Sequence, residues 1–383
     1  MKVTQAYKYE LQPSKRQLVL LSKHVGVARY AYNWGLHRKS EAYKKDKTKL
    51  SAIDLHKEIV QMKKTTEFDW LNEVSKCAPQ EALRNLDSAF TSFYKRCKQG
   101  GKPGYPRFKS KHKSKDSCKF TGTILVKAAR KVQLPVLGKL RTKESTKKFK
   151  GRILGATVSR EADRWFVSFN VEVDREIGKP ATSERVGADL GLKTFATLSD
   201  GTQIYAPKPL KKKLKQLKRR SKQHSKKQKK SNNRRKSSLR LAQLHRRIRN
   251  TRKDFINKLT TELAKTKQVI VIEDLNVSGM IKNHKLARSI NDAGWGEFRK
   301  QLDYKTGWYG SELIIVDRFF PSSKICSNCG KKKKNLTLKE RVFLCEACGF
   351  SCDRDLNAAI NLRDYLPEVL RKVTPVEMKA LTC

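Results

Sequence analysis

The sequence predicts a multidomain α/β protein built from two successive units. In the first half, one early strand pattern is followed by helical segments and then by several short strand patterns. In the second half, strand patterns come first as a meander and then alternate with helical patterns. This order of elements is typical of mixed α/β architectures with more than one domain.

Length and charge limit what the chain can do. Its 383 residues suffice for two or three domains, and 38% of them are apolar. The formal net charge of +51 makes a folded chain repel itself unless a polyanion neutralises it, so we expect a nucleic acid partner. A membrane surface is the competing interpretation. No apolar run could span a bilayer, and residues 1–17 lack the apolar core of a signal peptide, which predicts a soluble, intracellular protein.

The first half predicts a strand-rich domain into which helices are inserted. Residues 2–11 alternate like a strand. Helical spacing of apolar residues follows in three segments, residues 17–43, 51–62 and 78–94. The stretch "KQGGKPGYPRFKSKHKSK" then breaks the periodicity, and short strand patterns follow it. We expect a small β-barrel made of residues 1–12 and 104–180, with residues 13–103 as the inserted helical domain.

The second half matches the element order of an RNase H-like α/β fold. "RVGADLGLKTFATLSDGTQIYAP" predicts three consecutive strands, and "KQVIVIEDL" and "SELIIVDR" predict two more. Helical patterns cover residues 289–309 and the segment from Asp355 onward. We expect three parts here: an α/β domain of residues 181–320 and 351–370, an insertion of residues 321–350, and a tail of residues 371–383 that we expect to be disordered.

Residues 208–253 contain 22 Lys or Arg and no Asp or Glu. A disordered tract is one interpretation, because blocks of like charge repel one another. Apolar residues at helical spacing favour instead a basic helical hairpin over residues 208–266, with "KKSNNRRK" as its turn. These residues are Leu210, Leu214, Leu217, Leu241, Leu244, Ile248, Phe255, Leu259 and Leu263. Such a hairpin would contact phosphates, which sets affinity without reading the base sequence.

Two CxxC motifs separated by 15 residues predict a structural zinc site. Zinc takes four soft or borderline ligands in a tetrahedron, and four protein ligands leave no open position for catalysis. The four ligands would be Cys326, Cys329, Cys345 and Cys348. Cys352 would be a fifth, so we expect it to be a small buried apolar residue instead. The alternative, four unligated thiols, would leave this short stretch without a core.

Carboxylates at the ends of predicted strands are candidates for metal chemistry. Metal-dependent cleavage of phosphodiesters needs carboxylates that hold two cations about 4 Å apart. Asp189 lies in the apolar strand "VGADLG", a costly place for a charge that has no cation. Glu273 and Asp274 end the strand "VIVIED", and only one of them can face the same site because neighbouring strand residues point to opposite faces. A cap or a salt bridge is the alternative role for each.

Helical phase separates the two aspartates of "GFSCDRDLNAAINL". Asp355 shares a helix face with Ala359, Leu362 and Leu366, the apolar stripe that must lie on the sheet. Asp353 stands at the helix entrance, where it suits the N-cap role. Packing therefore favours Asp355 for the site and Asp353 for the cap.

With these residues in place, the chain resembles TnpB, the transposon-encoded RuvC-like nucleases related to type V CRISPR effectors. "GYPRFKSK" resembles a signature of that family, and "GADLGLKTFATLSDG", "VIVIEDLNVSGM" and "CDRDLNAAINL" resemble its three nuclease motifs. The zinc ribbon falls just before the third motif, as in the family, and the likeness extends over nearly the whole chain. The resemblance implies that Asp189, Glu273 and Asp355 form a catalytic triad that binds two Mg²⁺ ions.

The resemblance also implies an RNA-guided DNA endonuclease of a transposable element. A transposon-derived guide RNA would pair with one strand of double-stranded target DNA, and hydrolysis would occur beside a short flanking motif. Lys76, Gln80 and Thr123 would lie near that motif, and Tyr105, Arg107 and Lys109 near the nucleic acid backbone. The location would be the cytoplasm of a prokaryote, at the nucleoid. The residues leave open a strand-transferring transposase, a non-catalytic zinc-ribbon regulator, and the choice between monomer and dimer.

Overall fold

The computed structural model describes residues 1–101, 104–111, 114–147, 151–337 and 339–366. The chain forms two compact units, Met1–Arg175 and Glu176–Cys383, and each has its own hydrophobic core. The expected tail, residues 371–383, and the last residues of the expected segment 351–370 lie outside the described part of the chain.

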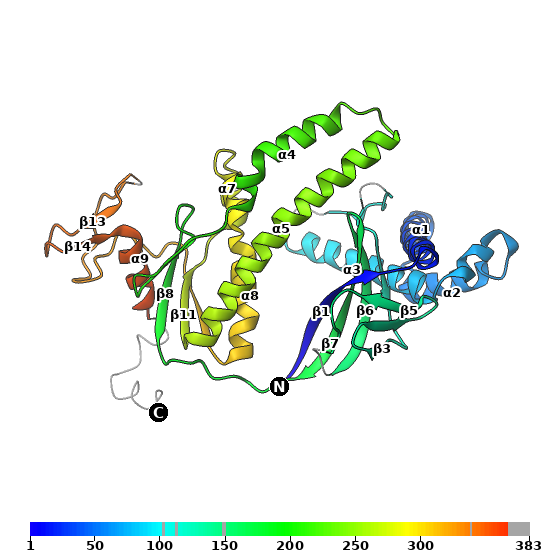
Figure 1. Ribbon diagram of the computed structural model, residues 1–383, viewed down its shortest axis with the longest axis horizontal. Helices are drawn as coiled ribbons and strands as arrows, with labels where there is room; N and C mark the ends of the chain where they lie inside the picture. Colours follow the sequence, from blue (N-terminus) through cyan, green and yellow to red (C-terminus); the bar gives the residue numbers. More distant parts are fainter. Residues whose placement is uncertain (102–103, 112–113, 148–150, 338, 367–383) are drawn as a thin grey trace. The chain divides into compact units, whose positions relative to one another are not determined.

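The first unit contains an open seven-stranded sheet with the order β2-β6-β7-β1-β5-β4-β3. β1 and β7 are neighbours in it (Figure 1). Its strands are β1 (Lys2–Gln12), β2 (Ser117–Phe120), β3 (Leu125–Ala128), β4 (Lys131–Leu134), β5 (Gly138–Thr142), β6 (Arg152–Glu161) and β7 (Arg164–Asp174). The early strand β1 lies at the centre, between β7 and β5. The expected closed barrel is not confirmed, because no pairing among the described residues joins the edge strands β2 and β3. Closure depends on strand tilt and stagger, which alternation in a sequence does not reveal.

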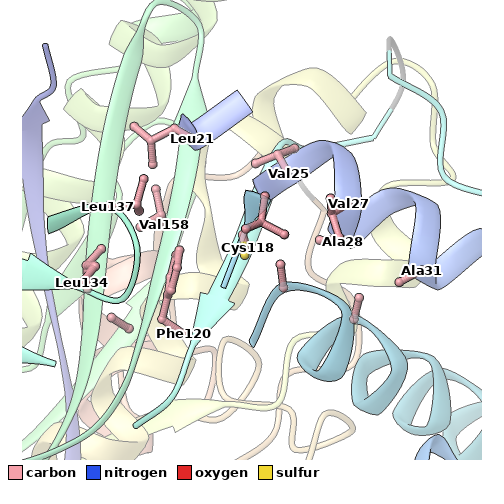
Figure 2. Packing of buried hydrophobic residues seen from close by; sticks show 14 of the residues in the cluster. Leu21, Val25, Val27, Ala28, Ala31, Cys118, Phe120, Leu134, Leu137 and Val158 are labelled. Carbon is pink, nitrogen blue, oxygen red and sulfur yellow. The ribbon is translucent and has the colours of Figure 1, made fainter. Parts of the chain in front are cut away.

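The helices of the first unit are α1 (Lys15–Asp46), α2 (Ala52–Met62), the 3₁₀ helix η1 (Thr66–Glu73) and α3 (Cys77–Lys98). α1 and α3 extend beyond the predicted segments at both ends, α2 begins one residue later than predicted, and η1 was not predicted. A capping box starts α1, in which Ser14 Oγ accepts from Gln17 N and Gln17 Oε1 accepts from Ser14 N. Figure 2 shows Leu21 of α1 in one apolar cluster with Phe120 of β2 and Val158 of β6. The helices and the sheet of this unit therefore share one core.

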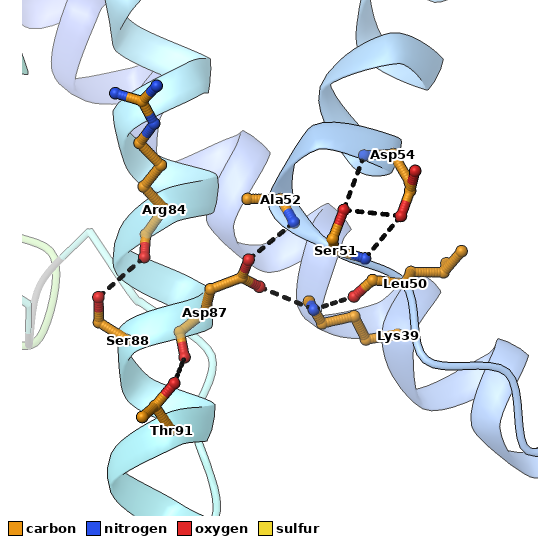
Figure 3. A network of polar contacts seen from close by, with 9 residues as sticks. All are labelled: Lys39, Leu50, Ser51, Ala52, Asp54, Arg84, Asp87, Ser88 and Thr91. Atoms are coloured by element: carbon orange, nitrogen blue, oxygen red, sulfur yellow. Dashed lines mark hydrogen bonds and ion pairs between the residues drawn. The ribbon is translucent and has the colours of Figure 1, made fainter.

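One carboxylate of α3 joins the three helices of the first unit (Figure 3). Asp87 accepts a hydrogen bond from the backbone N–H of Ala52, at the start of α2, over 2.7 Å. It also forms an ion pair of 2.8 Å with Lys39 of α1. Lys39 in turn donates to the carbonyl oxygen of Leu50. These contacts hold the start of α2 against the middle of α3 and the C-terminal half of α1.

The second unit contains a five-stranded sheet with the order β10-β9-β8-β11-β12. The strands are β8 (Arg185–Leu190), β9 (Ala196–Leu198), β10 (Gln203–Ile204), β11 (Val269–Glu273) and β12 (Glu312–Val316). The first three pair antiparallel as a meander, and β11 lies parallel between β8 and β12. The predicted order of a meander followed by strands alternating with helices is therefore confirmed.

Helices of the second unit cover its sheet on both faces: α4 (Pro209–Ser225), α5 (Asn232–Thr266), α6 (Val277–Met280), α7 (Ala287–Ala293), α8 (Trp295–Tyr309) and α9 (Arg354–Arg363). Ile256 of α5 and Phe298 of α8 pack in one cluster with Ile270 of β11. The single helix expected over residues 289–309 is wrong, because Gly294, with φ +77°, separates α7 from α8. Within the described ranges, no helix has the length and apolar character to cross a bilayer.

Candidate active site

Two carboxylates share one face of the sheet in the second unit, at the C-terminal ends of β8 and β11. The strands are parallel neighbours, with Gly187 opposite Val271. Because side chains alternate along a strand, Asp189 and Glu273, two residues further on, point to the same face as this pair. Val271 packs against Leu362 of α9. Asp189 and Glu273 therefore lie on the face that α9 covers.

The helix α9 brings a third carboxylate to this face. Its N-cap Asp353 accepts hydrogen bonds from the N–H groups of Asp355 (2.9 Å) and Leu356 (3.1 Å), so the predicted cap is confirmed. Asp355 lies half-buried in the first turn, and Leu362 on the predicted apolar stripe is fully buried. Leu366 remains 38% exposed, so the stripe ends one turn earlier than expected.

α9 lies in direct contact with β8 because Gly187 has no side chain. A Cβ atom at Gly187 would be 2.0 Å from the carbonyl oxygen of Ala359 and 2.4 Å from the backbone nitrogen of Arg363. Both are backbone atoms, so no side-chain rotation could make room. This close approach sets the distance between the helix that carries Asp355 and the strand that carries Asp189.

The three carboxylates interact electrostatically. Burial, followed by the negative charges of Glu273 and Asp355, raises the pKa of Asp189 to about 7. The cationic Arg354 acts in the opposite direction, and its guanidinium lies 3.3 Å from Asp355. In the part of the chain that the structure describes, the oxygens of the three carboxylates do not all lie within 4.8 Å of one another. The negative charges of the three carboxylates and the partial burial of Asp189 together favour a bound cation at this site.

Asp274, the other candidate at the end of β11, belongs to the opposite face. Its carboxylate forms ion pairs with Arg299 of α8 and with Arg318, the latter at 2.5 Å. Arg318 and Arg299 both hold the pKa of Asp274 below its usual value. Of the two adjacent acids, Glu273 is thus the one that lies on the Asp189 face.

Sequence reasoning missed three polar side chains around these carboxylates. The Ser322 hydroxyl donates a hydrogen bond to Glu273 Oε1. Asn357 and Asn361, one turn apart on α9, bond to the backbone of the segment that leads into the first CxxC motif. The signal was available: two amides four residues apart within an apolar helix face are costly to bury unless they are hydrogen-bonded.

The four predicted cysteines come together. Their Sγ atoms all lie within 4.8 Å of one another, with 3.7 Å between Cys326 and Cys348 and 3.6 Å between Cys329 and Cys345. A tetrahedron with Zn–S bonds of about 2.3 Å has edges of about 3.8 Å, so the arrangement fits zinc. Backbone N–H groups, that of Ala347 first, lower the pKa of the Cys345 thiol, which favours the thiolate at this position.

Cys352 lies outside this cluster of four sulfurs. It belongs to β14 (Ser351–Asp353), which pairs with β13 (Val342–Leu344), and it lies opposite Phe343. Its side chain is half-buried against the small core of the ribbon, and burial raises the pKa of its thiol. Cys352 therefore packs against the ribbon and is not a fifth ligand, as expected, but it is half-buried where the prediction had it buried.

The basic segment forms two helices, α4 and α5, that run side by side as a hairpin (Figure 1). Arg220 of α4 donates to the carbonyl oxygen of Arg240 of α5 over 2.9 Å. Leu244, Ile248, Leu259 and Leu263 of the predicted seam are buried, whereas the α4 leucines are only partly covered. The turn between the helices covers residues 226–231 and therefore lies slightly before the expected turn, residues 229–236. Most of the Lys and Arg side chains of the two helices are exposed.

The base of the hairpin depends on a residue that sequence reasoning missed. The N-cap residue of α4 makes no side-chain capping bond. Instead Asp292 of α7, which is 6% exposed, accepts from the N–H groups of Leu210 and Lys211, each over 3.0 Å. A carboxylate at a helix N-terminus satisfies unpaired N–H groups and complements the helix dipole. Asp292 therefore fixes where α4 leaves the core of the second unit.

The six residues expected near nucleic acid all lie in the first unit. Lys76 and Thr123 are exposed, and Gln80 is half-buried. The start of α3 contacts the turn after β2, because Cys77 Sγ donates to the carbonyl oxygen of Thr121. The remaining three come from "GYPRFKSK": Tyr105, Arg107 and Lys109.

These three differ in how they are held. Arg107 is exposed. The Tyr105 hydroxyl bonds to Ser40 over 2.9 Å, and its ring lies edge-on to Phe90 and Phe93. The Lys109 ammonium lies 3.7 Å from the centre of the Tyr32 ring, and burial lowers the pKa of Lys109. Lys109 therefore contributes to packing, whereas Arg107 is the freest of the three side chains.

Sequence profiles match three parts of the chain. A profile described as "Probable transposase" covers residues 168–284, one described as "Cas12f1-like, TNB domain" covers residues 295–362, and one described as "Helix-turn-helix domain" covers residues 1–48. The second match spans α8, β12, the cysteine cluster and most of α9.

Relatives match over nearly the whole chain. A Streptomyces pristinaespiralis protein named "Putative RNA-guided DNA endonuclease" is 39% identical over 369 residues, which cover 94% of this chain and 89% of that protein. An Escherichia coli K12 protein named "Putative RNA-guided DNA endonuclease InsQ" is 32% identical over 380 residues, which cover 94% of this chain and 92% of that protein. An Acanthamoeba polyphaga mimivirus protein named "TnpB-like protein L79" is 34% identical over 32% of this chain and 24% of its own length.

A solved structure shares the fold. The protein in "Cryo-EM structure of the Cas12f1-sgRNA-target DNA complex" superposes with a TM-score of 0.50 over 95% of this chain and 99% of that one, at 16% identity. This likeness shows a Cas12-like multidomain α/β fold. Together with the full-length relatives above 30% identity, it leads to one conclusion: the chain belongs to the TnpB family.

Proposed function

We propose that this protein is an RNA-guided DNA endonuclease whose nuclease site consists of Asp189, Glu273 and Asp355. The observation that carries the proposal is the convergence of the three carboxylates on one sheet face, where together with burial they raise the pKa of Asp189 to about 7. Perturbed carboxylates that cluster at the C-terminal ends of neighbouring parallel strands are typical of a catalytic site. The names of the full-length relatives support the same activity.

These residues fit Mg²⁺. Hard carboxylate oxygens suit Mg²⁺, and a poorly solvated aspartate with two acidic neighbours gains most from a divalent cation. When bound, two such ions would activate a water molecule and stabilise the leaving oxygen of the phosphodiester. The chain's own contribution is to hold the carboxylates on β8, β11 and α9 and to desolvate Asp189 in part. The cysteine cluster would hold one Zn²⁺ as a structural ion beside α9.

Cys348→Ser is expected to lower the zinc content of the purified protein well below one equivalent, because it removes one of four ligands. Cys352→Ser is the matched control, since Cys352 lies outside the cluster, and it should keep its zinc. Elemental analysis of both proteins after gel filtration measures the difference. Loss of zinc from both variants alike would contradict the assignment of the four ligands.

The partners we propose are a transposon-derived guide RNA and double-stranded target DNA. The net charge of +51 and the basic hairpin α4–α5 supply the surface that polyanions require. The protein that shares the fold was solved with a guide RNA and target DNA. Lys76, Gln80 and Thr123 are our candidates for reading the flanking motif, and Tyr105 and Arg107 for backbone contacts. Such a nuclease acts at the nucleoid, in the cytoplasm of a prokaryote.

The alternative functions are less well supported. A strand-transferring transposase would share the acidic triad, and one matching profile carries that description. The full-length relatives are named for endonuclease activity instead. A non-catalytic zinc-ribbon regulator gives no reason to place the half-buried Asp189 beside two other acids.

Sequencing of the RNA that co-purifies with the protein tests the proposed partner. We expect a discrete RNA with a constant part and, at its 3′ or 5′ end, a part that matches the DNA next to the element. A guide RNA must carry such target sequence. Purification in high salt should remove it, since phosphate contacts dominate the affinity. Co-purifying RNA of random composition would contradict the guide-RNA proposal.

A further inference from the structure

A buried serine outside the carboxylate cluster contacts one of its members. Ser322 lies in the segment between β12 and the first CxxC motif and is 4% exposed. Its hydroxyl donates a hydrogen bond to Glu273 Oε1. A serine hydroxyl has one proton, so this bond directs that proton to one carboxylate oxygen and leaves Glu273 Oε2 free to bind a cation.

The backbone of Ser322 is held by α9. The Ser322 carbonyl oxygen accepts from the side-chain amide of Asn361 over 2.7 Å. The same amide donates to the carbonyl oxygen of Ile325, also over 2.7 Å, and Asn361 is only 8% exposed. The Ser322 N–H donates to the carbonyl oxygen of Phe320 over 2.9 Å. The hydroxyl is therefore presented to Glu273 from a fully bonded backbone position.

A second amide holds the same segment one turn earlier on α9. Asn357 is fully buried, donates to the carbonyl oxygen of Ile325 over 2.7 Å and accepts from the N–H of Ser327 over 3.0 Å. Asn357 and Asn361 thus bind the segment at two successive turns of the helix that carries Asp355. The position of Ser322 is therefore tied to that of Asp355.

These contacts couple two of the three carboxylates. Glu273 ends β11, and its long side chain could adopt several rotamers if nothing held it. A metal site tolerates errors of only about 0.5 Å in its ligands, and hydrogen bonds from neighbouring side chains supply that precision. The chain from Asp355 through α9 and Asn361 to Ser322 fixes where Glu273 Oε1 lies relative to Asp355.

We propose that Ser322 is a positioning residue that orients Glu273 for metal binding, and that Asn361 holds Ser322 in place. This inference rests on the proposed function only in taking Glu273 as a metal ligand. It assigns no chemical step to Ser322, whose hydroxyl keeps its proton throughout.

The test is direct metal binding by the full-length chain after high salt has removed nucleic acid. Mn²⁺ serves as the probe, and its affinity is measured by electron paramagnetic resonance. For Ser322→Ala we expect an affinity about 10–100-fold weaker, the usual effect of removing a side chain that orients a metal ligand. The Mg²⁺ concentration that half-saturates DNA cleavage should rise in parallel. Zinc content and thermal unfolding should match the wild-type protein.

Two further variants separate positioning from packing. Ser323→Ala removes a neighbouring hydroxyl that is only half-buried, and it should bind Mn²⁺ as the wild type does. Ser322→Thr keeps the hydroxyl and should recover most of the affinity that alanine loses. Three results would overturn the proposal. The first is a Ser322→Ala variant that binds Mn²⁺ as tightly as the wild type, and the second is an equal loss of affinity in Ser322→Thr and Ser322→Ala. The third is a loss of zinc or of thermal stability in Ser322→Ala. If Mn²⁺ binding depends on Ser322 but no wild-type protein cuts DNA, the proposed function fails while the positioning role stands.

Discussion

Asp189→Asn is expected to reduce the rate of DNA cleavage by about 10³-fold or more, a barrier increase of about 4 kcal/mol. Asparagine has nearly the same shape, so the change removes the charge and leaves the packing of β8 intact. The folded protein should be at least as stable as the wild type. Burial and the charges of Glu273 and Asp355 disfavour the ionised Asp189, and an amide avoids that cost. Loss of activity together with unchanged or higher thermal stability is therefore the signature of a catalytic carboxylate.

Asp274→Asn is the matched control for Asp189→Asn. Asp274 is also an acid at the end of a central strand, but its ion pairs with Arg299 and Arg318 lie on the opposite face of the sheet. These pairs are partly exposed to solvent, so their loss should cost about 0–1 kcal/mol of stability. Cleavage should stay within a small factor of the wild-type rate. Wild-type cleavage by Asp189→Asn, or equal inactivity of both variants, would contradict the assignment of the site.

Gly187→Ala is expected to have the second largest effect, on both cleavage and stability. The new Cβ would meet two backbone atoms of α9 at 2.0 and 2.4 Å, so the helix itself must move away from β8. Overpacking of this kind costs about 1–3 kcal/mol. Displacement of α9 carries Asp355 away from Asp189, so cleavage should fall much further than the loss of stability alone explains. Single-turnover cleavage and thermal unfolding of the same preparation measure the two effects.

Gly307→Ala is the control for the glycine replacement. Gly307 lies within α8, and a Cβ there would meet nothing within 4 Å. Alanine is the better helix former, so this variant should be unchanged or slightly stabilised and should cut DNA normally. Wild-type activity in Gly187→Ala would show that the close approach of α9 does not set the geometry of the site.

Local patterns in the sequence predicted much of the candidate site. Helical phase separated Asp353 from Asp355, because the cap and the buried stripe follow from the positions of neighbours along one helix. The spacing of the two CxxC motifs likewise predicted which four cysteines meet. In both cases the information lies within one short stretch of the sequence.

Other features depend on contacts between distant segments and could not be predicted from the sequence. Strand alternation left open the choice between Glu273 and Asp274, which only the family resemblance made. Arg299 and Arg318, which come from other elements, place Asp274 on the opposite face. Ser322 contacts Glu273 across 49 residues of sequence. The open sheet of the first unit is a further case, since alternating patterns predict strands but not whether the last strand returns to the first.

The most direct test of the account is cleavage of double-stranded DNA after the guide portion of the bound RNA has been replaced. The account predicts that the reconstituted full-length protein cuts DNA matching the new guide, stops cutting the old target, and requires Mg²⁺. Asp189→Asn, loaded with the same RNA, should bind that target without cutting it. Cleavage that continues at the old position after the guide is exchanged, or that proceeds without RNA, would contradict the central claim.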